Sequence, residues 1–484
     1  MTGPPRALLA AIMENPLMPV APKGHAPVGT DVFASTVFMR HAGEDWRYCF
    51  DFKCWLSWDG RRWLVDRTGQ HRLAAKNAFI AELSYAIKTS EDKLEKAMRS
   101  ALDRRRIDAA LHLAEPELAI TAAELDQDAN SLNCFNGTID LQTSALRKHS
   151  RRDFNTKVVA YDYNPRAKCE LWLTTLHRLM GGGADASEAD LDRAERMVAY
   201  LQRIFGYALN GLTSEKAVFV PFGAGNNGKS TLLTTYRRVI EQYAAYLDIN
   251  TLMTKQESNN TQADLADLRG ARFVQSSEAE EGQRLSQGKL KRITQGMGVI
   301  KAVRKYENPI EFPETHKLFL DTNRKPEIAD GDDRATFNRL HPIPFTVTIS
   351  EDEIDRELPE KLMAEAEGIL AWAVEGARLW FESGLQRPRE ITAARAEWQA
   401  ESDQIGRFLD DCCVVLETLR TSADQLYYQY SRWIDRSGEH RPVTANAFGR
   451  KMASRGFQKQ HTKRGSVYQG VGLNPDRCQE GGER

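Results

Sequence analysis

Apolar and polar residues alternate along this chain in ways that predict both strands and helices. Residues 46–50 and 55–64 are rich in aromatic side chains. Within the second range, aromatic residues on both sides meet at Asp59-Gly60, a pair typical of a hairpin turn. We expect the aromatic rings to form the core of a small sheet, although they could also stack on bases. Residues 73–124 have helical periodicity, and residues 130–141 predict a strand, a turn and a second strand.

Further along, longer helices alternate with short apolar runs. Residues 167–180 and 188–209 look helical, and the glycine-rich segment 181–187 between them is a candidate boundary. Short buried strands are predicted at 217–222, 270–278 and 316–323, followed by a helical region at 351–384. The pattern predicts an α/β fold with this division: a flexible lead-in at 1–30, an α+β module at 31–180, a central domain at 188–385 and a C-terminal domain at 390–484.

The stretch GAGNNGKS at 223–230 fits the P-loop pattern G-x-x-x-x-G-K-[ST]. A predicted strand precedes it, and a predicted helix from Thr231 to Tyr243 follows, so backbone N–H groups at the helix start would point at a phosphate. Lys229 would reach the β- and γ-phosphates of ATP, and Ser230 would hold Mg²⁺. The expected nucleotide-binding residues are Gly223, Gly225, Asn226, Asn227, Gly228, Lys229, Ser230 and Thr231.

Polar residues end the next two predicted strands. Glu278 is the last residue of the predicted strand at 270–278, which we expect beside the P-loop strand. Its carboxylate would bind Mg²⁺ through water or activate the attacking water. Glu280 is a close second choice, and the alternative is a solvated acidic turn. Asn323 ends the following strand and could orient the attacking water. Arg334 and Arg339 could neutralise transition-state charge as fingers, or form surface salt bridges.

Two basic segments could contact a phosphate backbone. Two β-type stretches at 299–312 flank Glu-Asn-Pro and carry Lys301, Arg304 and Lys305. Near the C-terminus, a helix capped by Thr444 and ended by Gly456 precedes a hairpin with a basic turn, which is a winged-helix arrangement. The alternative is a solvated charged face. The candidate DNA-binding residues here are Arg450, Lys451, Arg455, Lys459, Lys463 and Arg464.

Composition narrows the possibilities further. The net charge of −1 over 484 residues leaves no global basic excess, so nucleic acid would be bound by local patches. The seven cysteines form no zinc pattern and predict reduced thiols. No signal peptide and no run of 18 apolar residues is present, so we expect a soluble, cytoplasmic protein without membrane contact. Asp126 and Asp128 could bind a metal, but a helix-end loop is the favoured interpretation.

Taken together, these motifs resemble the superfamily 3 DNA helicases of the phage/plasmid primase–helicase type, also found in poxviruses. The resemblance covers residues 31–475. It rests on W-L-x-W-D-G-x-x-W at 55–63, N-G-x-I-D-L at 136–141, the P-loop, K-L-K-R-I-T-Q-G at 289–296, Thr322-Asn323 and R-L-x-x-I-P-F ending at Phe345. Three family positions differ: Gly296-Met297-Gly298 replaces Gly-Gly-Asp, Ala302-Val303 replaces Ala-Arg, and Asp321 replaces a small residue.

The resemblance implies an AAA+-type parallel ATPase core that assembles as a hexameric ring. Arg339, with Arg334, would reach the ATP of the neighbouring subunit, and the hairpin would line the channel. The ring would translocate 3′→5′ on single-stranded DNA and act on forked DNA in a phage, prophage or plasmid replication system of a bacterial host. Because only about 30 residues precede the resemblance, priming is expected to need a separate primase.

Other functions remain open at this stage. The runner-up is a ring-forming, DNA-dependent ATPase that melts, loads or remodels DNA without processive unwinding, and the altered hairpin favours it. A small-molecule kinase or GTPase would leave the basic C-terminal segment without a role, and the guanine signature Asn-Lys-x-Asp is absent. A DNA-binding protein with a degenerate P-loop is disfavoured because Lys229-Ser230 is intact.

Overall fold

The computed structural model of the chain describes residues 26–254, 260–277, 284–303, 309–328, 333–437, 442–463 and 465–474. The chain divides into two compact units. The first holds the chain up to Asp128 together with Asn133–Ile139 and Leu146–Val158, and the second holds the remainder.

The first unit contains a helical group and a small mixed sheet in the order β3-β2-β1-β4. Trp46, Trp55 and Trp63 of this sheet are buried, with Trp46 at 7% and Trp63 at 1% exposure, so the aromatic runs form a core as predicted, although Trp58 is only half-buried. The hairpin at Asp59-Gly60 is also confirmed. The elements of the first unit up to Ile120 are α2 (Asp31–Ala42), β1 (Trp46–Cys49), β2 (Cys54–Trp58), β3 (Trp63–Val65), α3 (Gln70–Thr89), α4 (Asp92–Ala101), α5 (Arg104–Ala114) and β4 (Ala119–Ile120).

Local backbone geometry explains two features of this unit. The helical run expected at 73–124 is divided at Ser90, which adopts a left-handed conformation with φ 56°, and again at Asp103, whose side chain caps α5. Asp126 accepts hydrogen bonds from the Thr156 backbone N–H at 2.7 Å and from its hydroxyl. This fits the favoured interpretation of Asp126 as a loop residue. Further along the chain lies the three-stranded sheet β5 (Ser131–Cys134), β6 (Gly137–Asp140) and β7 (Ala145–Arg147).

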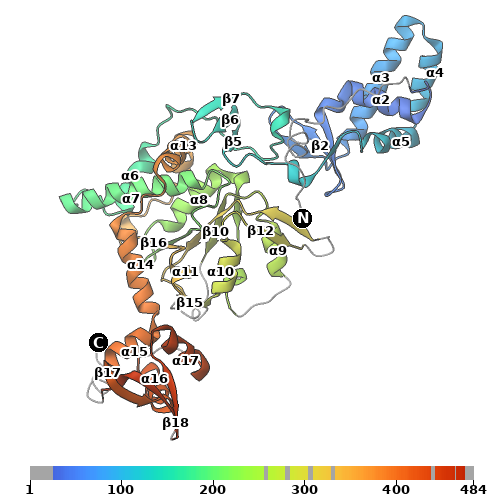
Figure 1. Ribbon diagram of the computed structural model, residues 1–484. Helices are drawn as coiled ribbons and strands as arrows, with labels where there is room; N and C mark the ends of the chain where they lie inside the picture. The colour runs from blue at the N-terminus through green and yellow to red at the C-terminus, as the bar shows by residue number, and fades with distance from the viewer. Residues whose placement is uncertain are drawn as a thin grey trace. The chain divides into compact units, whose positions relative to one another are not determined.

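The second unit is built on a parallel sheet (Figure 1). Its strands have the order β16-β8-β14-β10-β9. The strand predicted at 270–278 is β10, and we expected it directly beside β8. That expectation was wrong, because β14 lies between β8 and β10. The apolar run of β10 specified a strand without specifying its neighbours. The strands are β8 (Val218–Phe222), β9 (Ala244–Tyr246), β10 (Phe273–Ser277), β14 (Lys317–Asp321) and β16 (Leu340–Pro344).

Aromatic residues cover one face of this sheet. Phe219, Phe273 and Phe319 point to the same side, and Phe205 of α7 (Glu188–Tyr207) stacks on Phe319 with ring centroids 5.8 Å apart. The helix α8 (Lys229–Val239) joins this layer through Tyr236, whose hydroxyl donates to the Phe205 carbonyl oxygen at 2.6 Å. Behind α7 packs α13 (Ala366–Ser383).

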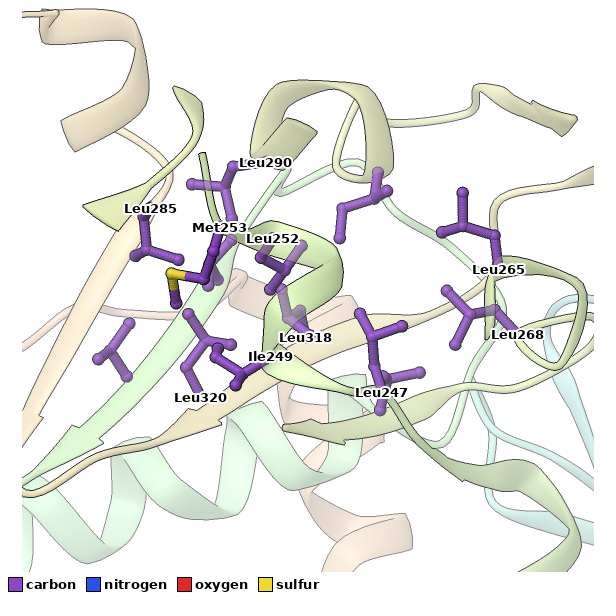
Figure 2. Packing of buried hydrophobic residues seen from close by; sticks show 14 of the residues in the cluster. Leu247, Ile249, Leu252, Met253, Leu265, Leu268, Leu285, Leu290, Leu318 and Leu320 are labelled. Atoms are coloured by element: carbon purple, nitrogen blue, oxygen red, sulfur yellow. The ribbon is translucent and has the colours of Figure 1, made fainter. Parts of the chain in front are cut away.

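Aliphatic residues fill the opposite face. Leu318 and Leu320 of β14 pack with side chains from the connections and short helices on that side, including Leu252 and Leu290 (Figure 2). Helices therefore lie on both faces, as a buried parallel sheet requires. The remaining elements of this part are α6 (Glu170–Leu179), α9 (Asn260–Ala266), β11 (Arg284–Leu285), α10 (Gln287–Ile293), β12 (Val299–Ala302), β13 (Ile310–Pro313), β15 (Glu327–Ile328), α11 (Arg334–Phe337), α12 (Leu358–Met363) and α14 (Arg389–Ser402).

Strand β16 forms one edge of the sheet and contains two prolines. The Arg339 carbonyl oxygen and the Phe345 N–H both bond to β8, at 2.7 and 2.8 Å. Because successive residues of a strand point their backbone groups in opposite directions, His341 and Ile343 also face β8, whereas Pro342 and Pro344 face away from it. Proline is tolerated at an edge because no ladder hydrogen bond is lost there.

The C-terminal part of the chain has its own apolar cluster around Phe408, Tyr430 and Phe448. Its sheet has the order β17-β19-β18, and the predicted helix after Thr444 and the following hairpin are both present. The long strand β17 was not anticipated. The elements are α15 (Gln404–Cys412), β17 (Cys413–Ser422), α16 (Ala423–Arg436), α17 (Ala445–Ser454), β18 (Lys459–Thr462) and β19 (Gly465–Leu473).

The predicted α/β class with a parallel sheet is thus confirmed. None of the helices in the described ranges has the length and apolar character needed to span a membrane.

Candidate nucleotide site

The loop at 223–228 connects β8 to α8 at the carboxyl edge of the parallel sheet. In open α/β sheets this edge is where ligands bind, because loops there surround a crevice beyond the strand ends. The sequence prediction of strand, loop and helix is confirmed, although α8 begins at Lys229 and ends at Val239 rather than extending to Tyr243.

The two glycines at the fixed positions of the loop are required by its shape. A Cβ atom on Gly223 would lie 2.1 Å from the Phe345 carbonyl oxygen. Gly228 has φ 73°, which favours glycine, and a Cβ there would lie 2.8 Å from a Leu179 methyl group. By contrast, a Cβ on Gly225 would meet no atom within 4 Å, so that position is open.

Lys229 is almost fully buried, at 3% exposure, in the first turn of α8. Its Nζ donates to the Gly223 carbonyl oxygen and to Asn227 Oδ1, both at 2.8 Å. The Asn227 Nδ2 in turn donates to the Phe345 carbonyl oxygen at 3.4 Å. The ammonium group is therefore held across the loop by oxygen acceptors, and phosphate oxygens could take the place of those acceptors.

Ser230 is joined to the neighbouring strand. Its Oγ donates to Asp321 Oδ2 at 2.6 Å, and Asp321, the last residue of β14, is only 6% exposed. Asp321 was noted in the sequence only as a departure from the family pattern and was given no role. The signal that could have identified it is an acidic residue ending a strand that is buried throughout, since buried carboxylates are rare unless they are paired.

The oxygen atoms of Ser230 and Asp321 suit a hard cation such as Mg²⁺. Among the residues with described positions, no group of at least three His, Cys, Asp or Glu side chains could hold a metal ion alone. A magnesium ion at this edge would therefore share its coordination with nucleotide phosphates, as Mg²⁺ commonly does.

The other predicted site residues differ in what can be said of them. Asn323 is exposed just past the end of β14, at the same sheet edge as the loop, and Thr231 is half-buried in α8. Strand β10 ends there as well, at Ser277, but Glu278 and its alternative Glu280 lie outside the described residues.

Arg339 and Arg334 lie at the opposite edge of the sheet. The Arg339 carbonyl oxygen accepts from the N–H of Val218, the first residue of β8, and its guanidinium donates to the Ala335 carbonyl oxygen at 2.7 Å. Arg334 begins α11, directly before β16. Within one chain these arginines are therefore remote from Lys229, so any finger role would have to be played toward another copy.

The predicted basic hairpin is present as β12 paired antiparallel with β13. Lys301 is opposite Glu311 in this pairing, and the two side chains form an ion pair at 2.7 Å. The bond to Glu311 raises the pKa of Lys301. Arg304 and Lys305 lie outside the described residues.

In the C-terminal part, Arg450 and Lys451 line a shallow depression on α17 with Ala447 and Ser454. Lys459 and Lys463 are exposed in and beside β18. Arg455 differs from these because its guanidinium forms an ion pair with Asp403. Arg464 lies outside the described residues.

Three family models match successive parts of the chain. The family described as D5 N terminal like matches residues 35–181, a family of unknown function matches residues 222–339, and the family described as Poxvirus D5 protein-like matches residues 400–471. Models of D5-type families thus match near both ends of the chain.

Two curated relatives are helicase-named viral proteins. One, from Acanthamoeba polyphaga mimivirus, is 27% identical over 64% of this chain and 33% of its own length. The other, from Frog virus 3 (isolate Goorha), is 24% identical over 48% of this chain and 26% of its own length. The chain thus matches a third or less of either relative. Neither relative is bacterial, so the predicted bacterial host has no support from them.

Among solved structures, the chain is similar to the NrS-1 C terminal region in its apo structure and its A form apo structure. These similarities have TM-scores of 0.48 and 0.47 at 10% sequence identity, and they cover 91% of this chain and 99% of the other. These similarities add nothing to the family assignment. The family matches and the viral relatives confirm the predicted resemblance to the superfamily 3 primase–helicases of the phage/plasmid and poxvirus type.

Proposed function

We propose that this chain is an ATP-dependent DNA helicase of a viral or mobile-element replication system, with an AAA+-type ATPase core. The observation that carries the proposal is the loop at the carboxyl edge of the sheet, where buried Lys229 and the Ser230–Asp321 pair converge beside an open position at Gly225. The helicase-named relatives support DNA unwinding as the work that ATP hydrolysis drives.

In this proposal, Lys229 exchanges its acceptors in the loop for phosphate oxygens of ATP, and the N–H groups at the start of α8 donate to the same phosphates. Mg²⁺ held at Ser230 would neutralise charge on the β- and γ-phosphates. Glu278 would activate water, and Asn323 would orient it. Arg339, with Arg334, would serve the site of a neighbouring copy in a ring, which we take to be a hexamer by resemblance.

DNA would be bound by the hairpin β12–β13 and by the C-terminal part. The succession of α15, β17, α16, α17, β18 and β19 supports a winged-helix fold for that part. By resemblance, the ring would move 3′→5′ on single-stranded DNA and open forks, with priming left to a separate primase. The exposed cations Arg450, Lys459 and Lys463 and the half-buried Lys451 support this role because phosphate contacts dominate DNA affinity.

One observation favours a second candidate, a ring-forming ATPase that melts or loads DNA without processive unwinding. The described cation of the hairpin, Lys301, is already paired with Glu311. A hairpin of this kind would grip the DNA backbone only through Arg304 and Lys305.

The test compares the ATPase rate with and without single-stranded DNA for the wild type and Lys229→Ala, with the oligomeric mass measured on the same samples. A DNA-stimulated rate from a ring, abolished by the substitution, supports a DNA motor. A 3′-tailed fork then separates the two candidates, since only a helicase releases the displaced strand. A monomer with a low rate that ignores DNA would overturn both.

A further inference from the structure

The carboxylate of Asp321 occupies a position that the proposed ATPase site needs and that was not assigned in the sequence. We infer that Asp321 is the protein carboxylate that holds the magnesium ion of the bound nucleotide, acting together with Ser230. The inference rests on the proposed function.

The strand order places Asp321 beside the loop. β14 is the immediate neighbour of β8, and Thr322, the residue after Asp321, pairs with Phe222, the residue before Gly223. β10, which leads toward Glu278, is one strand further away. Asp321 is therefore the acidic residue that ends the strand adjacent to the P-loop strand.

The two oxygen atoms are held together by a hydrogen bond, at a separation about 0.3 Å shorter than that of two adjacent ligands on one magnesium ion. Adjacent ligands of octahedral Mg²⁺, each at about 2.0–2.1 Å, lie about 2.9 Å apart. Ser230 Oγ and Asp321 Oδ2 lie 2.6 Å apart and point at each other. A small movement of the exposed Ser230 side chain would allow a cation to bridge them.

The end of β10 offers no described carboxylate for this purpose. In P-loop ATPases the metal is held by the P-loop Ser or Thr and by a Walker-B Asp. Here β10 ends in Ser276 and Ser277, and Ser277 is opposite Asp321 in the sheet. The Ser277 hydroxyl is bonded to the Tyr246 hydroxyl at 2.7 Å. Asp321 thus supplies a carboxylate at the end of β14, whereas the described end of β10 has none. Glu278 is then left to act on water.

The competing explanation is structural. A carboxylate near the first turn of α8 would stabilise the helix N-terminus and fix Ser230 without touching a metal. The two roles differ in their metal dependence: a metal ligand matters only when Mg²⁺ is present, whereas a structural carboxylate matters for nucleotide binding with and without it.

The experiment measures equilibrium binding of a fluorescent, non-hydrolysable ATP analogue to the full chain, in a magnesium titration and in EDTA. For Asp321→Asn, which keeps the size of the side chain, we expect the half-saturating magnesium concentration to rise about tenfold or more, with affinity in EDTA within about twofold of wild type. Electron paramagnetic resonance with Mn²⁺ in place of Mg²⁺ should show the same loss of bound metal in the nucleotide complex.

The matched control is Ser277→Ala, which alters the facing residue of the same sheet edge and should leave the metal titration unchanged. Equal magnesium dependence for Asp321→Asn and wild type would overturn the inference alone. Loss of analogue binding in EDTA as well would assign Asp321 to the shape of the loop and also overturn it. Wild-type protein that binds no nucleotide, or binds it equally well after Lys229→Ala, would instead overturn the proposed function.

Discussion

Replacing Gly376 by alanine should loosen the helical layer that seats the P-loop helix. Gly376 is in α13, where a Cβ atom would lie 2.0 Å from the Gln202 carbonyl oxygen of α7. Gly206 of α7 makes the reciprocal approach, since its Cβ would lie 2.1 Å from the Ala377 nitrogen. Both contacts are with backbone, which cannot rotate away as a side chain can.

The size of the effect follows from these distances. The contact must lengthen by at least 1.0 Å to reach 3.0 Å, a separation below which real Cβ contacts essentially never occur. Overpacking of this kind costs about 1–3 kcal/mol, and the backbone contact favours the upper end. Alanine in a helix interior returns about 1 kcal/mol relative to glycine. We therefore expect a net loss of about 2 kcal/mol in the free energy of opening this layer.

Hydrogen exchange read by mass spectrometry measures this loss locally, without assuming that a chain of two units unfolds in a single step. Peptides from α7 and α13 should exchange about 30-fold faster in Gly376→Ala, since 1.4 kcal/mol corresponds to a factor of ten. Peptides from α8 should follow, because Tyr236 of α8 bonds to Phe205 of α7. The nucleotide affinity should fall with them.

Gly288→Ala is the matched control. This glycine is in α10, where a Cβ would meet nothing within 4 Å, so the substitution should leave stability unchanged or raise it by up to about 1 kcal/mol. If Gly376→Ala slowed exchange or left it unchanged, as the control is expected to do, the close approach of α7 and α13 would be refuted.

Three further outcomes are expected. Burial raises the pKa of Glu314 from 4.5 to about 7, so the folded state keeps a proton that the unfolded state has lost between these values. The free energy of unfolding therefore falls by about 3 kcal/mol as pH rises through that window. Glu314→Gln should flatten this part of a plot of unfolding free energy against pH, and an unchanged slope would contradict the raised pKa. The Thr444 hydroxyl caps α17 by accepting from the Ala447 N–H at 3.3 Å. Thr444→Ala removes this cap and should speed hydrogen exchange in α17 by the equivalent of about 1 kcal/mol, whereas Thr444→Ser should not. Equal effects of the two substitutions would argue against the cap. Tyr236→Phe leaves the buried Phe205 carbonyl oxygen without that donor and should cost about 1–2 kcal/mol in the opening of α8, so unchanged exchange there would exclude the bond.

Local patterns carried much of the fold. The glycines and Lys229-Ser230 located the loop because its geometry depends on residues within a few positions of one another. The hairpins at Asp59-Gly60 and around β12–β13 were likewise encoded by adjacent turn residues and short apolar runs. The helix after Thr444 was recognisable from its cap and its terminating glycine.

What depends on distant contacts could not be read in the same way. The sequences of β10 and β14 both indicate buried strands, but neither contains the information that β14 lies next to β8. The role of Asp321 was missed for that reason, since its bond to Ser230 joins residues far apart in the chain. Arg334 and Arg339 follow Asn323 closely in sequence, yet the return of the chain into β16 places them at the opposite sheet edge.

The two prolines of β16 limit how copies of this chain could associate. A strand edge recruits another strand by offering it a row of N–H and C=O groups. Here Pro342 and Pro344 face outward and have no N–H to offer. A second chain therefore cannot extend the sheet along this border by backbone pairing. Copies in a ring would therefore have to meet through surfaces other than this border, and those contacts could loosen and re-form during a cycle of nucleotide hydrolysis without pulling a strand from this edge.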